Sequence, residues 1–351
     1  MTLLAPDRAA GFDDIGIDVV RRARRRPARR TALVLLGLLV LLVAVVGARV
    51  LLGDYTITIP DFLRIITGTE IPVASYIVME VKLPRALLGV LVGTAFGVGG
   101  AIFQTTLRNP LASPDIIGVT TGASAAAVLA IVALDQAGTW VSVAAVSGAI
   151  GVAVLVRLVA DTLLGHRLVL VGIGMAAGLL SVIQYLFTRA DVYDAQLALR
   201  WMTGSLNQVD WPTVRFFATC FAVLVPLVLW GARILRITEL GQDAAAALGV
   251  KPGRVDTLLL LAVVLVALAV AAAGPIAFVS FLAGPISRQL NRGRTTIVGA
   301  GLVGAIIVVG ADYVADYLLA DVNYPVGVVT GALGAPFLLW LLAVGRAGRR
   351  A

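Results

Sequence analysis

The chain has 351 residues, of which 60% are apolar and only 14% are charged, and its formal net charge is +8. Soluble globular proteins are closer to half apolar and a quarter charged, so this composition excludes a soluble globular domain and a disordered chain. Apolar runs of about 20 residues recur along the sequence, and each is long enough to cross a bilayer as a helix. The composition predicts an all-α integral membrane protein.

Residue counts exclude several classes of function. The chain has one cysteine, Cys220, and one histidine, His166, so a single chain can build neither a disulfide framework nor a His/Cys zinc site. Its two lysines, Lys82 and Lys251, are followed by Leu and Pro, whereas an ATPase phosphate loop needs Lys followed by Ser or Thr. We therefore expect no metal, no cofactor and no catalytic residues in this chain. The arginine excess indicates cytoplasmic loops and not nucleic-acid binding.

The N-terminal region combines an arginine block with an apolar run. Seven of the ten positions from 21 to 30 are arginine, and the apolar stretch 31–52 follows. Asp13, Asp14 and Asp18 argue against a secretory signal peptide, and an apolar stretch of 22 residues suits a retained span. We interpret 1–30 as a cytoplasmic tail, 31–345 as one transmembrane domain and 346–351 as a second cytoplasmic tail.

About ten spans are expected, with both termini in the cytoplasm. This layout places 21 of the 28 Lys and Arg residues on the inner side, which agrees with the positive-inside rule. Span eight is short and contains Pro285, so a broken or tilted helix is expected there, with its freed backbone groups facing protein or a cavity. The expected spans are 31–52, 86–107, 115–134, 139–160, 168–187, 213–232, 256–273, 276–290, 297–318 and 326–345.

Glycines recur four residues apart within the expected spans. This spacing lets helix backbones approach closely where lipid gives helices no hydrophobic reason to associate. Ordinary membrane packing explains it, and sliding interfaces are the functional alternative. The positions are Gly89, Gly93 and Gly97, then Gly118 with Gly122, Gly174 with Gly178, and Gly327 with Gly331.

Three connecting segments carry most of the remaining polar information. Lys82 and Arg85 place positive charge at the outer mouth of span two, which fits either an acidic partner or snorkelling cationic side chains. The inner connection 108–115 has Pro at positions 110 and 114, which predicts an irregular structured loop. The inner segment 231–256 predicts a helical hairpin, with one short helix over 243–248 stopped by Gly249 and a second helical start at Arg254.

Acidic residues near the outer end of span nine suggest transport coupled to protons or ions. Asp312 and Asp316 lie four residues apart, and carboxylates within a membrane commonly mark a proton or ion path. No basic residue in a span is expected to match them. A proton-coupled secondary transporter would use these carboxylates as ion carriers. If the chain is instead an ATP-driven importer, replacing either residue by Asn should leave uptake largely intact.

Six sequence strings, in this order over ten spans, resemble the FecCD family of ABC importer permeases. The resemblance covers about residues 55–345 and implies a type II ABC importer permease-like bundle. Members of that family move ferric siderophores, haem and cobalamin across the inner membrane of bacteria. The strings are KLPR (82–85), RNPLASPDIIGVTTGA (108–123), RWMTGSLNQVDW (200–211), GQDAAAALGV (241–250), GPIAFV (274–279) and PVGVVTGALGAPFLLWLL (325–342).

The resemblance implies a role for each connecting segment. Lys82 and Arg85 match the basic pair that receives acidic residues of an extracytoplasmic siderophore-binding protein. The inner hairpin matches the coupling helices that seat in an ABC ATPase dimer, whose subunits bind ATP and Mg²⁺. Its expected coupling residues are Glu239, Gly241, Gln242, Asp243, Ala244, Leu248 and Gly249.

Two inner loops resemble a cytoplasmic gate. Asn109 and Leu111 match one gate loop, and Gly165 and His166 fall in the second by similar placement. A lone histidine there is also compatible with a solvated loop residue. The run 284–288 lacks the histidine that many members carry in Pro-His-x-x-Arg. Because some ferric-siderophore systems of the family pair two unlike permeases, this departure favours a homologous permease as the partner, and a second copy of the chain is the alternative.

These inferences together predict a permease subunit for ferric-siderophore uptake, multi-pass in the bacterial inner membrane. Cobalamin or haem import by the same architecture is the alternative within the class. A membrane-embedded enzyme would need clustered polar groups that this sequence hardly offers. A structural membrane protein would leave the hairpin and KLPR without roles.

Overall fold

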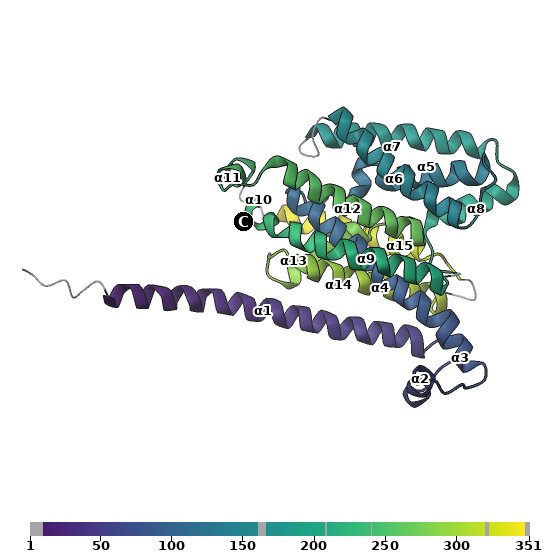
Figure 1. Cartoon of the computed structure of the whole chain (residues 1–351), viewed down its shortest axis with the longest axis horizontal. Coiled ribbons are helices and arrows are strands. Elements are labelled where there is room, and N and C mark those ends of the chain that lie inside the picture. Colours follow the sequence, from purple (N-terminus) through teal and green to yellow (C-terminus); the bar gives the residue numbers. More distant parts are fainter. Residues whose placement is uncertain (1–9, 161–165, 208, 240, 320–322, 348–351) are drawn as a thin grey trace, which may run out of the picture.

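The structure is a computed structural model that describes residues 10–160, 166–207, 209–239, 241–319 and 323–347 (Figure 1). These residues form helices joined by loops, and they include no β-strand. A helix occupies each of the ten ranges expected to span the membrane. These helices are α1 (Ala10–Leu51), α4 (Leu83–Thr106), α5 (Val119–Val132), α6 (Thr139–Ala160), α7 (His166–Phe187), α9 (Trp211–Gly231), α12 (Pro252–Ala273), α13 (Val279–Leu290), α14 (Ile297–Tyr317) and α15 (Val326–Ala347).

Shorter elements lie between these helices. Two of them, α2 and α8, belong to segments at the end of the bundle that the predicted topology places outside, which is called the outer end below (Figure 1). The shorter elements are α2 (Ile59–Ile66), α3 (Ala74–Tyr76), the π-helix η1 (Ile77–Lys82), the 3₁₀-helix η2 (Pro114–Ile117), α8 (Val192–Thr203), the 3₁₀-helix η3 (Ala232–Ile234), α10 (Leu235–Thr238) and α11 (Gln242–Ala247).

Seven helical segments in the described residues are long and apolar enough to cross a membrane, which makes the chain a multi-pass membrane protein. The apolar segments Val119–Val132 and Val326–Trp340 are shorter, and α13 has only 12 residues. The count of ten crossings and the cytoplasmic placement of the termini therefore stay predictions. α1 begins at Ala10, so the helix extends into the region predicted as a tail.

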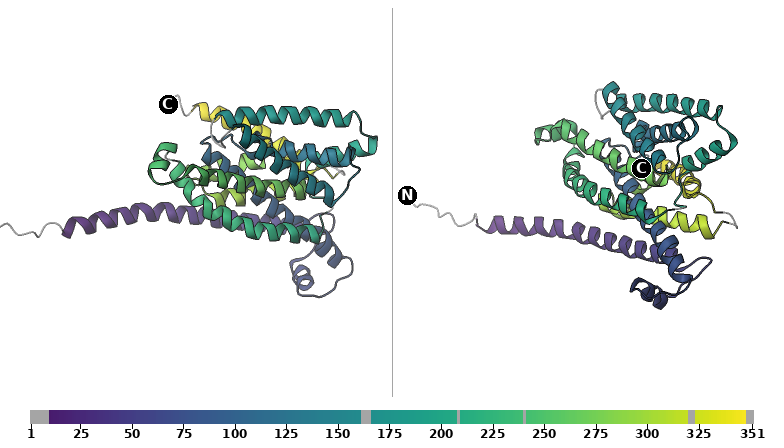
Figure 2. Two further views of the ribbon diagram at one scale, coloured as in Figure 1. Left: turned by 45° about the horizontal axis from the view of Figure 1, so that its top comes forward. Right: turned by 45° about the vertical axis from the view of Figure 1, so that its right-hand side comes forward.

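α4 is the centre of the packing. It contacts α14, α12, α13 and α9, and α12 also contacts α6, which links this group to the group formed by α5, α6, α7 and α8. α1 lies along one edge of the bundle and packs against α14 and α4 (Figures 1 and 2). Few residues of α1 between Ala28 and Leu51 are buried, as expected for a helix that faces lipid.

Glycines bring α4 and α14 into backbone contact. A Cβ atom on Gly93 would lie 2.5 Å from the carbonyl oxygen of Gly304, and one on Gly97 would overlap the carbonyl oxygen of Ala300. The predicted close approach is confirmed for this helix pair. In α7 the same spacing does not mark a close approach, because a Cβ on Gly174 would meet no atom within 4 Å.

The expected irregularity of span eight is present, but it lies before Pro285. The chain turns at Gly274 and Phe278, which have φ of +72° and +65°, and α13 then continues through Pro285 without a break. A proline nitrogen cannot donate to the carbonyl four residues earlier, which here belongs to Phe281. Gln104 Nε2 of α4 donates to that carbonyl at 3.1 Å. The prediction that a protein group binds the freed carbonyl is therefore confirmed. The predicted interruption of the helix at Pro285 is wrong, because the irregular turn lies before α13.

Candidate functional site

Charged side chains from three helices meet at the outer end of the bundle. Arg49 lies in the last turn of α1, and Arg85 lies in the first turn of α4. Asp312 and Asp316 lie one turn apart on α14 and therefore share a helix face. α1 ends and α4 begins at the end of the bundle where α14 ends, so all four side chains lie at similar depth. These residues are called the outer ionic cluster below.

The outer ionic cluster pairs each charge at short distance. Arg49 Nε lies 2.6 Å from Asp312 Oδ2, and its Nη2 lies 3.0 Å from Asp316 Oδ2. Arg85 binds the same carboxylates, with Nη2 2.8 Å from Asp312 Oδ1 and Nη1 3.2 Å from Asp316 Oδ2. Arg49 and Asp312 are each 1% exposed. Unpaired charges at such burial would be strongly destabilising, so the mutual pairing is what makes the cluster tolerable.

Two neighbours extend the cluster to the segment after α1. Arg49 Nη1 donates to the hydroxyl of Tyr317 at 3.1 Å. Lys82 is 3% exposed, and its Nζ donates to the carbonyl oxygens of Leu52 and Tyr55 at 2.7 and 2.8 Å. These bonds fasten the end of α1 and the start of the following connection, residues 53–81 (the outer segment below), to α4 and α14.

This geometry bears on two expectations. Docking of a binding protein at Lys82 and Arg85 stays a prediction, but Lys82 is buried, Arg85 is mostly buried, and both hold partners within the chain. Asp312 and Asp316 were expected to lack a basic partner, but Arg49 and Arg85 pair with both. A partial signal was available, because the predicted topology already places the end of span one, the start of span two and the end of span nine on the same side of the membrane.

The predicted hairpin is present at the opposite end of the bundle, where α10 and α11 project between α9 and α12 (Figure 1). Gly241 and Gly249 bracket α11 with φ of +118° and +82°, a backbone conformation that favours glycine. The predicted short helix is confirmed, although α12 begins at Pro252 and not at Arg254.

The hairpin offers an exposed apolar tip. Leu248 is 61% exposed and Glu239 is exposed, whereas Ala245 is buried and Ala244 is half-buried. Gln242 and Asp243 are the first residues of α11, and their side chains lie outside the described part of the structure. The exposed tip is suited to contact with another protein.

The first predicted gate loop is an ordered turn beside the hairpin. Asn109 Oδ1 accepts a hydrogen bond from the backbone nitrogen of Leu111 at 2.9 Å, which forms an Asx turn. Asn109 is exposed and Leu111 is half-buried. The guanidinium of Arg108 comes within 3.7 Å of the Cβ position of Gly241, so this loop and the hairpin are adjacent.

The second predicted gate loop is only partly described. Gly165 lies outside the described residues, and His166 is the first residue of α7, without a described side chain. Just before this loop, Arg157 at the end of α6 forms an ion pair with Asp256 near the start of α12, at 3.2 Å.

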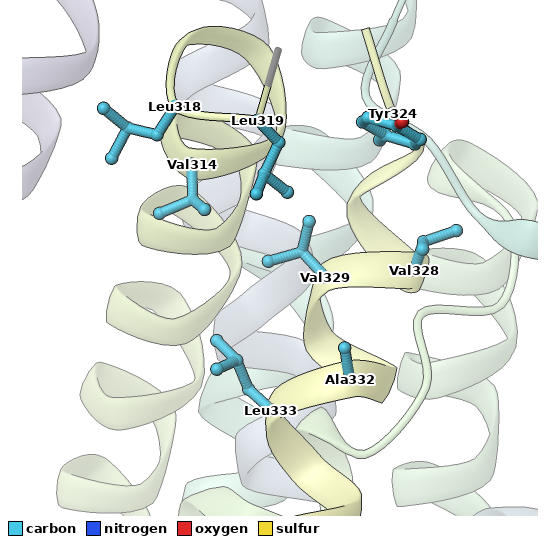
Figure 3. Close-up of a pocket in the computed structure, with 8 residues that line it drawn as sticks. All are labelled: Val314, Leu318, Leu319, Tyr324, Val328, Val329, Ala332 and Leu333. Carbon is cyan, nitrogen blue, oxygen red and sulfur yellow. The ribbon is translucent and has the colours of Figure 1, made fainter. Parts of the chain in front are cut away.

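An open groove of about 500 Å³ lies between α14 and α15 near the outer end (Figure 3). Within the part of the chain that the structure describes, its lining is apolar except for the hydroxyl of Tyr324. Among the described residues, no three His, Cys, Asp or Glu side chains gather as a metal site would require. The lining residues are Val314, Leu318, Leu319, Tyr324, Val328, Val329, Ala332 and Leu333.

The sequence profile of the FecCD transport family matches residues 38–344. The chain belongs to this family. Its relatives include the ferric enterobactin transport system permease protein FepG of Escherichia coli (strain K12), 39% identical over 76% of this chain and 82% of FepG. The Fe(3+) dicitrate transport system permease protein FecD of the same organism is 36% identical over 76% of this chain and 85% of FecD.

A relative from a second organism and a solved structure support the same assignment. The Fe(3+)-citrate import system permease protein YfmE of Bacillus subtilis (strain 168) is 31% identical over 92% of this chain and 96% of YfmE. A solved inward-facing structure assigned to the metal-chelate class of ABC transporter superposes with a TM-score of 0.79. The two chains are 28% identical in sequence, and the match covers 88% of this FecCD chain and 98% of the solved chain. The family is one of transport permeases and not of catalytic proteins.

Proposed function

We propose that this FecCD chain is the membrane-spanning permease subunit of a binding-protein-dependent ABC importer in a bacterial inner membrane, with a ferric siderophore as cargo. The observation that carries the proposal is the match of the FecCD profile to residues 38–344, almost the whole apolar part of the chain. The names of FepG and FecD, which refer to ferric enterobactin and Fe(3+) dicitrate, support an iron chelate as cargo.

The chain would act with three kinds of partner. An ATPase dimer binds ATP and Mg²⁺ and seats the hairpin of α10 and α11. A second copy of the chain, or a homologous permease, completes the transport path. An extracytoplasmic siderophore-binding protein delivers the cargo.

The transport step requires movement of packed helices and no covalent chemistry in this chain. ATP-driven closure of the ATPase dimer moves the hairpin, and the bundle switches between outward and inward access. The first gate loop adjoins the hairpin at Gly241, which supports a direct transfer of this movement. The outer ionic cluster holds α1 in place and supplies no free carboxylate as an ion carrier, which disfavours the proton-coupled alternative.

Replacing Leu248 by Asp is expected to reduce co-purification of the ATPase severalfold, because the substitution puts a charge on the exposed apolar tip of the hairpin. The ATPase would be co-expressed and its ratio to the permease measured after affinity purification. The permease itself should be recovered in normal amounts, since Leu248 contributes little to the core.

Leu134→Asp is the matched control, because Leu134 is 59% exposed in the loop after α5 at the opposite end of the bundle. It should leave the ATPase ratio unchanged. If Leu248→Asp leaves ATPase binding unchanged, the ATPase does not bind at the exposed tip of the hairpin. An equal loss by both variants would assign the effect to exposed Asp in general.

A further inference from the structure

The outer segment contains a short amphipathic helix that its own sequence fixes. α2 begins after Thr58, whose hydroxyl oxygen accepts a hydrogen bond from the backbone nitrogen of Asp61 at 3.3 Å, and Pro60 occupies the first turn. Asp61 and Arg64 form an exposed ion pair at 3.8 Å on one side of this helix. The helix is therefore a defined element with a charged face.

The apolar face of α2 is wider than the area that the rest of the chain covers. Ile65 is buried in a small apolar cluster that includes Val50 of α1 and Ala86 of α4, and Phe62 packs against that cluster. At successive helical turns, Ile59, Leu63 and Ile66 extend the same apolar face, yet they are 63%, 57% and 51% exposed. Three large apolar side chains on one short helix need an apolar neighbour.

The placement of α2 identifies that neighbour. In Figure 1 the helix is viewed nearly end-on while α1 and the bundle run across the picture, so α2 lies crosswise to the spans. Figures 1 and 2 place it beside the outer end of α1, on the side away from the bundle. α1 itself exposes Leu36, Val40 and Val43 to lipid, at 57%, 61% and 64%. α2 thus lies beside the outer end of the lipid-facing surface of α1.

We propose that α2 is an interfacial helix whose face of Ile59, Leu63 and Ile66 enters the boundary between lipid headgroups and acyl chains. A helix with one apolar and one charged face lies in this boundary, parallel to the membrane plane. The ion pair of Asp61 and Arg64 then faces water. Exposed tyrosines flank the helix at Tyr55 and Tyr76, and tyrosine is enriched at membrane interfaces.

The test uses the full-length chain with Cys220 replaced by Ala, carrying one environment-sensitive fluorophore on Leu63→Cys or on Arg64→Cys. Both variants are reconstituted in vesicles of phosphatidylethanolamine and phosphatidylglycerol, with and without lipids that carry a nitroxide near the headgroup. We expect blue-shifted emission and severalfold stronger nitroxide quenching for the probe at position 63. Iodide in the water should preferentially quench the probe at position 64.

Three results would overturn the proposal. Equal iodide quenching at both positions, without nitroxide quenching, would place the helix in water. Shielding of position 63 that appears only on raising the protein-to-lipid ratio would assign the face to a second copy of the chain. Shielding that appears only on adding an extracytoplasmic binding protein would make α2 a protein-docking helix. The readout needs neither ATP nor cargo, so it is independent of the proposed transport function.

Discussion

Replacing Asp312 by Asn is expected to destabilise the protein by about 3–5 kcal/mol, because it removes one partner from a buried set of ion pairs. Arg49, only 1% exposed, and Arg85 would then share the single carboxylate of Asp316. The loss would be measured as a lower midpoint of thermal aggregation for the detergent-purified chain. Uptake should fall with the amount of folded protein, which reverses the expectation from sequence that Asn is tolerated.

Asp61→Asn is the matched control for this prediction. Asp61 also pairs with an arginine, but the pair with Arg64 has side chains 39% and 68% exposed, so its loss should cost well under about 1 kcal/mol. Equal midpoints for Asp312→Asn and the unmodified chain would contradict the role given to the outer ionic cluster. Normal stability with complete loss of uptake would instead indicate that Asp312 acts in transport.

Replacing Gly97 by Val is expected to separate α4 from α14 and to reduce the yield of folded protein sharply. Any side chain at position 97 overlaps the carbonyl oxygen of Ala300, and backbone cannot move aside as a flexible side chain can. Overpacking of a dense interior typically costs about 1–3 kcal/mol, and a clash with backbone lies at or above the upper end. Monodispersity and thermal midpoint after purification would measure the effect.

Gly174→Val tests whether the effect depends on close packing or merely on glycine in a membrane helix. Gly174 belongs to the same four-residue spacing, but a Cβ atom there meets nothing within 4 Å. This variant should retain the midpoint of the unmodified chain. If both substitutions lower the thermal midpoint equally, the α4–α14 contact is not the reason that Gly97 is required.

Hydropathy predicted the long helices well, because a run of about 20 apolar residues has few alternatives in a bilayer. It missed α2 and α8, whose mixed composition resembles that of a loop. It also placed the irregularity of span eight at Pro285, although proline can stay within a membrane helix when another group binds the freed carbonyl. That group is Gln104, which lies 177 positions away from Phe281 in sequence.

The candidate site was predictable where local residues determine it. Gly249 and Pro252 end one helix and begin the next, so the hairpin could be placed from sequence alone. Exposure could not be predicted in the same way, and this is why Lys82 and Arg85 were expected at the surface. Their burial depends on Asp312 and on the carbonyl of Leu52, and only the folded bundle brings these groups together.

Uptake of radioactive iron tests the central claim most directly. Cells that lack this chain and cells in which it is restored would receive iron as several ferric siderophores, with labelled cobalamin and haem in parallel, in a strain without redundant importers. We predict that uptake from at least one siderophore falls and returns on restoration. If only cobalamin or haem uptake falls, the proposed importer function stands and the proposed cargo is wrong. Unchanged uptake of all of them would contradict the proposed function.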